Sequence, residues 1–152
     1  MISNLPTTKT APKGGLSQIK EKSPFEIIEE DIEKFDLKMD PKKAYAALMQ
    51  MTQKSNYRIL RANDSILLID NHGNGTGEGI MFTADKPQTF VTTLRQFNKA
   101  LIKSGIKQMS FIASGIAIEP LLKKAKINYE AEPTTMTVGK EKRKALRITV
   151  YE

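Results

Sequence analysis

The fold is decided by residues 79–94, which read GIMFTADKPQTFVTTL. The apolar run at 80–82 predicts a strand, and Pro87 suits the first turn of a helix, where its missing N–H costs little. After it, apolar side chains recur at helical spacing over about four turns, which predicts a helix with one apolar face. The residues of that face are Phe90, Val91, Leu94, Phe97, Leu101 and Ile102. The helix is expected to end at Ser104-Gly105.

The composition is that of a globular chain with an uneven charge. Its 152 residues suffice for one domain with a sizeable core, and no apolar run approaches the ~20 residues that span a bilayer. The absence of cysteine excludes disulfides and thiolate metal sites. The net charge is +7, although residues 23–40 carry seven acids against two lysines. We therefore expect a cytoplasmic protein with no membrane partner, whose basic body attracts nucleic acid or acidic protein surfaces.

Two regions differ in composition. Residues 1–22 contain few large apolar groups and cannot bury enough surface to fold alone. We expect them to form an extended polar arm that binds other proteins of an assembly or copies of the same chain, and residues 23–152 to form one domain. The lysines of the arm are its candidate contacts, namely Lys9, Lys13, Lys20 and Lys22.

Helices are expected on both sides of a group of strands. Ser23 and Glu26 form a capping-box pattern, and Asp40-Pro41 begins a second helix that ends near residues 55–56. The remaining predicted elements are strands at 57–61 and 65–70, a glycine-rich loop at 71–79, a strand at 108–113, a helix at 117–126 and strands at 128–132, 135–138 and 145–151, the last two joined by a loop at 139–144. This order predicts an α+β fold.

The element order resembles the GNAT superfamily of N-acetyltransferases, and most of all the GNAT-like proteins that bacteriophages encode. Local matches are the sequence DLKMDPKKA at 36–44, ASGI at 113–116 and NYE at 128–130. The resemblance covers about residues 23–152 and implies a central, mostly antiparallel mixed sheet flanked by helices. In active members, a loop of the form Gln/Arg-x-x-Gly-x-Gly/Ala between the central strand and the long helix holds the diphosphate of acetyl-CoA on its backbone N–H groups.

The matching stretch here, residues 84–91, departs from that pattern. It has no glycine, Pro87 removes a donor, Asp85 adds a negative charge and Phe90 is bulky. For an active protein, the resemblance implies three cofactor-binding positions in this stretch, which are Lys86, Gln88 and Thr89.

The general acid that the family usually has, a Tyr ahead of a final Gly-aromatic pair, is also missing. Counting back from Tyr129 gives Lys124, and Asn128 stands where the Gly would be. We therefore expect no catalytic residue, no cofactor and no metal site. The resulting prediction is a non-catalytic structural protein, incorporated in a bacteriophage virion, that docks through its N-terminal arm.

Two alternatives remain open. The first is a divergent N-acetyltransferase that uses acetyl-CoA. The second is a nucleic-acid-binding protein whose C-terminal hairpin contacts phosphates through Lys140, Lys142, Arg143 and Lys144. The only histidine, His72, could serve as a base, but exposed loop histidines are usually idle.

Overall fold

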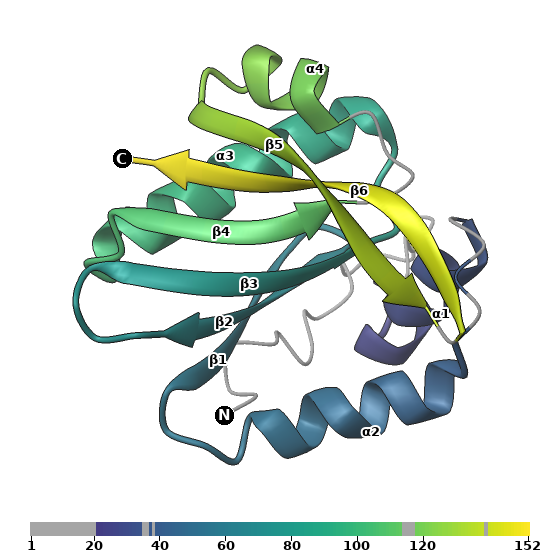
Figure 1. Ribbon diagram of the computed structural model, residues 1–152. Helices are drawn as coiled ribbons and strands as arrows, with labels where there is room; N and C mark the ends of the chain where they lie inside the picture. The colour runs from purple at the N-terminus through teal and green to yellow at the C-terminus, as the bar shows by residue number, and fades with distance from the viewer. Residues whose placement is uncertain (1–20, 35–36, 38, 114–117, 139) are drawn as a thin grey trace, which may run out of the picture.

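The computed structural model describes residues 21–34, 37, 39–113, 118–138 and 140–152. In these residues the chain forms four helices around one six-stranded sheet (Figure 1), which confirms the predicted α+β fold. The helices are α1 (Pro24–Lys34), α2 (Pro41–Met51), α3 (Pro87–Lys103) and α4 (Ile118–Lys124). The strands are β1 (Tyr57–Ala62), β2 (Ser65–Asn71), β3 (Thr76–Thr83), β4 (Gln108–Ala113), β5 (Asn128–Val138) and β6 (Glu141–Tyr151).

The strands lie in the order β1-β2-β3-β4-β6-β5. Every neighbouring pair is antiparallel except the central pair, β3 and β4, which is parallel. Parallel neighbours need a crossover connection, and α3 supplies it. Residues 79–94 therefore form part of a central strand and the helix that crosses between the two parallel neighbours.

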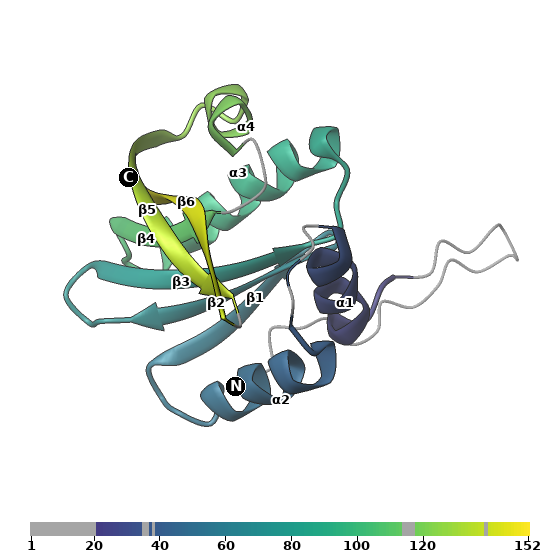
Figure 2. The ribbon, with the colours of Figure 1, turned by 45° about the vertical axis from the view of Figure 1, so that its right-hand side comes forward.

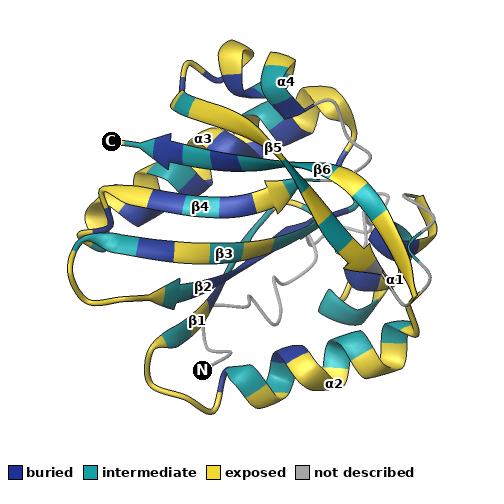
Figure 3. Ribbon diagram, viewed as in Figure 1, coloured by how far each residue is buried: buried dark blue, intermediate teal, exposed yellow. Residues whose placement is uncertain are grey.

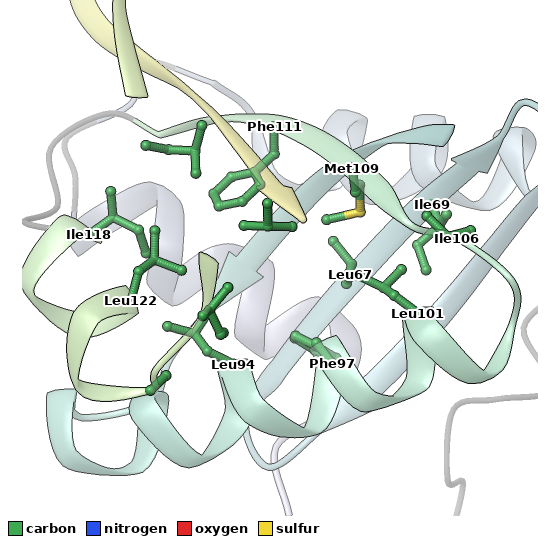
Figure 4. Packing of buried hydrophobic residues seen from close by; sticks show 14 of the residues in the cluster. Leu67, Ile69, Leu94, Phe97, Leu101, Ile106, Met109, Phe111, Ile118 and Leu122 are labelled. Atoms are coloured by element: carbon green, nitrogen blue, oxygen red, sulfur yellow. The ribbon is translucent and has the colours of Figure 1, made fainter. Parts of the chain in front are cut away.

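The helices cover the two faces of the sheet unequally. Figure 2 shows α3 and α4 on one side and α1 and α2 on the other. The α3 side carries the larger apolar core, in which Leu94, Phe97 and Leu101 of α3 pack with Met109 and Phe111 of β4 (Figure 4). On the other side, the buried strand residues that pack with α1 and α2 come from β1 and β2 only, with Phe82 of β3 beside them. No helix of the described residues covers the face of β4, β5 and β6 on that side.

Local signals explain where the helices begin and end. The predicted capping box is confirmed: Ser23 N–H donates to Glu26 Oε1 at 3.0 Å, and Glu26 N–H donates to Ser23 Oγ at 3.2 Å. Asp40 caps α2 by accepting from the N–H of Lys42 at 2.9 Å. The predicted end of α3 is also confirmed, because Gly105 follows it at φ +80°.

The apolar face of α3 is nearly as predicted. Phe90 and the three core residues named above are buried, and Val91 packs against them. Ile102 is a wrong assignment, since 39% of it is exposed. The face also includes Thr93, which the pattern did not predict. Its side chain can be fully buried because its hydroxyl donates to Asp85 Oδ2 at 2.7 Å.

Several predicted boundaries are wrong. The strands predicted at 128–132 and 135–138 form one continuous strand, β5. The loop at 71–79 is half strand, because β3 begins at Thr76 and pairs with β2 from Gly77 onward. The loop at 139–144 is mostly strand too: Glu141 to Lys144 belong to β6, which pairs with β5 in a two-stranded ribbon whose outer half is largely exposed (Figure 3). Charged side chains can point outward from both faces of such a ribbon, so a charge run does not end a strand there. Helix α2 also ends earlier than predicted, at Met51.

Candidate functional site

The two central strands separate before they end. Pairing between β3 and β4 covers only Thr76–Gly79 and Gln108–Phe111, and the last pair is Gly79 with Phe111. Both strands continue beyond it, β3 to Thr83 and β4 to Ala113, without further pairs among the described residues. This separation leaves a gap in the middle of the sheet, and beyond Gly79 the edge of β3 that faces β4 is not paired with that strand.

A cleft of about 370 Å³ lies at this gap. It is lined from the α3 and α4 side by Phe90, Phe111 and Ile118. From the opposite side of the sheet it is lined by Asp31 of α1 and by Arg147 of β6. The cleft therefore connects the two faces of the sheet, so that two molecules could meet between β3 and β4 from opposite sides.

The open edge of β3 presents backbone groups to the cleft. The N–H of Thr83 points away from β2, because it donates to Asp31 Oδ2 at 2.7 Å. Backbone groups of a strand alternate in direction, so Met81, two residues earlier, turns its N–H and C=O to the same edge. Since the pairing with β4 stops at Gly79, Met81 can pair with an extended ligand as a neighbouring strand would.

Asp31 is the most perturbed carboxyl group of this site. It is buried in α1, and that burial raises its pKa from the ordinary 3.8 to about 6, although the N–H of Thr83 and the charge of Lys34 oppose the change. A carboxylate with a pKa near neutrality that lines a cleft is suited to accept a proton. Sequence reasoning missed this residue. The available signal was its position, three residues after Ile28 and one before Ile32, on the face of α1 that is otherwise apolar.

The three predicted cofactor-binding positions lie together at the N-terminus of α3. Lys86 is the N-cap residue, its side chain makes no capping bond, and the first turn of α3 contains no acid. Gln88 and Thr89 are exposed, and N–H groups in the first turn of a helix have no partner within the helix. This end of α3 can therefore bind an anion with two backbone N–H groups and one ammonium group.

The predicted obstacles at this helix end point into the molecule. The carboxylate of Asp85 is buried and accepts hydrogen bonds from the N–H of Asp64 at 3.0 Å, from Ser65 Oγ at 2.6 Å and from Thr93 Oγ1 at 2.7 Å. Phe90 is 1% exposed and lies in the core. Neither side chain blocks the exposed N-terminus of α3. Pro87, which lacks an N–H, and the absence of glycine still count against anion binding there, as do Glu30 and Glu33 of α1, which line the same hollow.

The other predicted contact residues are dispersed. Lys22 forms an ion pair with Glu30 at 2.7 Å, and its backbone carbonyl accepts from Arg61. Lys140, Lys142 and Lys144 are exposed at the outer end of the β5–β6 ribbon. Arg143, beside them, pairs with Glu141 at 3.3 Å. The remaining predicted contacts, Lys9, Lys13 and Lys20, lie outside the described residues, and the binding of nucleic acid or protein by this whole set stays a prediction.

His72 lies in the turn between β2 and β3. Its Nε2 is 3.6 Å from Asp70 Oδ2 and 3.7 Å from Glu78 Oε1. Glu78 lines the cleft, but His72 does not. Within the described part of the chain, no group of three or more potential metal ligands comes together, and no helix is long and apolar enough to cross a bilayer.

Solved structures with the same architecture are acetyltransferases. A candidate ribosomal-protein-serine acetyltransferase from Vibrio cholerae aligns with a TM-score of 0.59 at 10% identity, over 84% of this chain and 88% of that one. The microcin C7 self-immunity acetyltransferase MccE, solved with acetyl-CoA and AMP, aligns with a TM-score of 0.57 at 9% identity, over 83% of each chain. A Bacillus subtilis acetyltransferase solved with CoA gives 0.51 at 11% identity, over 88% and 95%. No family model and no curated protein matches the sequence. The fold is therefore that of the GNAT acetyltransferases.

These neighbours correct the main functional prediction. The non-catalytic bacteriophage structural protein that the sequence suggested is contradicted, because the structures that share this fold are described as acetyltransferases. The inward orientation of Asp85 and Phe90 removes two of the physical arguments on which that prediction depended.

Proposed function

We propose that this protein is a divergent N-acetyltransferase, which moves an acetyl group from acetyl-CoA to a primary amine. The observation that carries the proposal is the cleft between β3 and β4, which is lined from both faces of the sheet. A reaction between two substrates needs a place where they meet with water largely excluded. The parting of two central strands provides such a place.

The cleft and the neighbouring N-terminus of α3, whose Phe90 lines it, fit the coenzyme in three respects. The extended, amide-containing arm of CoA matches the open edge of β3 at Met81, where one N–H and one C=O face the gap. Phe90, Phe111 and Ile118 provide apolar surface beside it. The exposed N-terminus of α3, with Lys86, offers a site for the diphosphate. When bound, acetyl-CoA supplies an acetyl group activated as a thioester.

The chemistry requires one proton acceptor from the protein. An ammonium acceptor loses two protons when the C–N bond forms and the C–S bond breaks; one ends on the departing sulfur and the other must leave. Asp31 is suited to take that second proton, because its pKa near 6 lets it be mostly ionised at neutral pH and still bind a proton. Its Oδ2 is held by the N–H of Thr83, which fixes the carboxylate at the wall of the cleft.

Calorimetry with acetyl-CoA tests the proposal. We expect a dissociation constant below about 100 µM, which corresponds to roughly −5.5 kcal/mol. Lys86→Ala should weaken that binding several-fold, because it removes the ammonium group of the N-cap residue of α3. The matched control is Lys99→Ala, which removes the same charge from an exposed position farther along α3 and should leave binding unchanged. Absence of binding at millimolar acetyl-CoA would refute the proposal.

A further inference from the structure

Arg147 differs from every other arginine of the chain. The sequence has five arginines. The other four hold partners: Arg58 binds Ser104 Oγ, Arg61 binds the carbonyls of Lys22 and Asn63, Arg95 binds the carbonyls of Lys124 and Ala125, and Arg143 binds Glu141. Arg147 is half-buried, yet no hydrogen bond or ion pair joins its guanidinium to any described residue.

Arg147 lies beside exposed apolar side chains of β3 and β4. Its direct neighbour across the β4–β6 pair is Ile112, which is 43% exposed, and Ile80 of β3 is 46% exposed in the same cleft. This is the face of the sheet that α1 and α2 do not cover. Glu132 stands opposite Arg147 in β5 but forms no ion pair with it within 4.0 Å. A half-buried guanidinium without a partner among the described residues keeps its N–H groups available to a ligand in the cleft.

Charges of opposite sign therefore face this cleft from different walls: the guanidinium of Arg147 is the positive one, and the carboxylates of Asp31 and Glu78 are the negative ones. Arg147 comes from β6, and Asp31 from α1 on the other side of the gap. A guanidinium presents paired N–H groups that match the two oxygens of a carboxylate. The carboxylate of Asp31 matches an ammonium group. A molecule that bears both groups complements both walls.

We propose that the acceptor is a free amino acid, whose carboxylate binds Arg147 and whose amine is directed toward Asp31. This inference rests on the proposed acetyl transfer and names its substrate class. The amine nitrogen forms the new C–N bond as the C–S bond of the thioester breaks, one of its protons ends on the sulfur and a second passes to Asp31 and on to water. Arg147 takes no part in these bond changes and acts as the residue that determines specificity.

Pairs of amino acids and the amines formed from them by loss of the carboxylate test this inference. Acetylation is measured for lysine against cadaverine, tyrosine against tyramine and histidine against histamine. In at least one pair, we expect a larger kcat/KM for the amino acid than for the matching amine. Arg147→Gln should lower kcat/KM for that acid roughly 10- to 100-fold, as expected for loss of a charge-assisted hydrogen bond, and leave the matching amine nearly unchanged. Arg147→Lys should restore part of the loss, because it keeps the charge but not the paired donors.

The matched control is Lys144→Gln. Lys144 lies three residues before Arg147 in β6, hence on the opposite face of the strand, and it is exposed. The Lys144→Gln variant loses the same unit charge as Arg147→Gln, but at a side chain that does not reach the cleft. It should keep the preference for the amino acid.

A binding measurement separates the two proposals. Line broadening of amino-acid signals in NMR reports their binding to the chain without coenzyme, and Arg147→Gln should abolish it. If acetyl-CoA binds and each amine is acetylated with the same kcat/KM as its parent amino acid, the amino-acid inference is wrong. The acetyltransferase proposal is then retained. If amino acids bind through Arg147 but acetyl-CoA does not bind, the acetyltransferase proposal fails while the site at Arg147 remains. If no amino acid either binds or is acetylated, the inference is overturned.

Discussion

The carboxylate of Asp31 accepts a 2.7 Å hydrogen bond from the backbone N–H of Thr83, which joins α1 to the last residue of β3. This bond occupies an N–H on the open edge of the central strand. It leaves Met81, two residues earlier, as the position whose backbone groups face the gap.

The buried position of Asp31 predicts a specific dependence of stability on pH. Because its pKa is raised from 3.8 to about 6, the folded chain binds this proton more tightly than the unfolded chain does. Its contribution to stability is complete below about pH 4 and is lost as the pH rises through about 6. Asp31→Asn keeps an oxygen acceptor for Thr83 but has no charge to bury. At about pH 7.5 the free energy of unfolding of the variant should exceed that of the wild type by up to roughly 3 kcal/mol, while at about pH 4 the two values should be similar.

Urea unfolding at both pH values checks this prediction. Glu33→Gln, at a position on α1 that is exposed, serves as the control and should shift stability little at either pH. An equal effect of Asp31→Asn at the two pH values would show that the carboxyl group is not perturbed by burial.

The network around Asp85 predicts a large loss on truncation. Asp85→Ala leaves the N–H of Asp64 and the hydroxyls of Ser65 and Thr93 without their shared acceptor. Ser65 and Thr93 would retain Thr83 Oγ1 and the carbonyl of Thr89 as other acceptors, but the loss of a buried, charge-assisted acceptor shared by three donors should still lower the free energy of unfolding by about 3 kcal/mol. The adjacent, exposed Lys86→Ala should change it by less than about 0.5 kcal/mol. Similar losses from both variants would mean that the network contributes little.

Two glycines of β3 should differ in their tolerance of a methyl group. At Gly77 an added Cβ would lie 2.9 Å from the backbone carbonyl oxygen of Asp70, which cannot move without shifting β2. At Gly79 it would meet Leu67 Cδ1 at 3.0 Å and Met109 Sδ at 3.1 Å, both ends of flexible side chains. Gly77→Ala should therefore lower the melting temperature more than Gly79→Ala, with a loss of about 1–3 kcal/mol. Thermal unfolding followed by circular dichroism decides between them, and a reversed order would contradict the geometry.

Neighbouring residues at the end of α3 provide a test of its buried face. Leu101 is 4% exposed and Ile102 is 39% exposed. Leu101→Ala should cost about 2–5 kcal/mol, because it leaves a cavity in the larger core, and Ile102→Ala should cost less than about 1 kcal/mol. Chemical denaturation of the two variants gives the comparison directly. Equal losses would place Ile102 in the core, as the sequence pattern had predicted.

Features set by nearby residues were predictable from sequence, and features set by distant ones were not. Ser23 and Glu26 cap α1, and Gly105 ends α3, because each signal acts within one turn. The separation of β3 and β4 depends on where pairing between Gly79 and Phe111 stops, and those residues are far apart in the chain. The direction of the Asp85 carboxylate depends in the same way on Ser65 and Thr93. Its charge was visible in the sequence, but its partners were not.

The gap in the sheet has a consequence for exchange with solvent. Amide hydrogens in a central strand are normally among the slowest to exchange, but the amide of Met81 has no partner in β4. In heavy water it should lose its hydrogen far sooner than the flanking amides that bond to β2. A ligand that pairs with β3 would slow this exchange again. The exchange rate of the Met81 amide therefore reports whether a ligand is bound between β3 and β4.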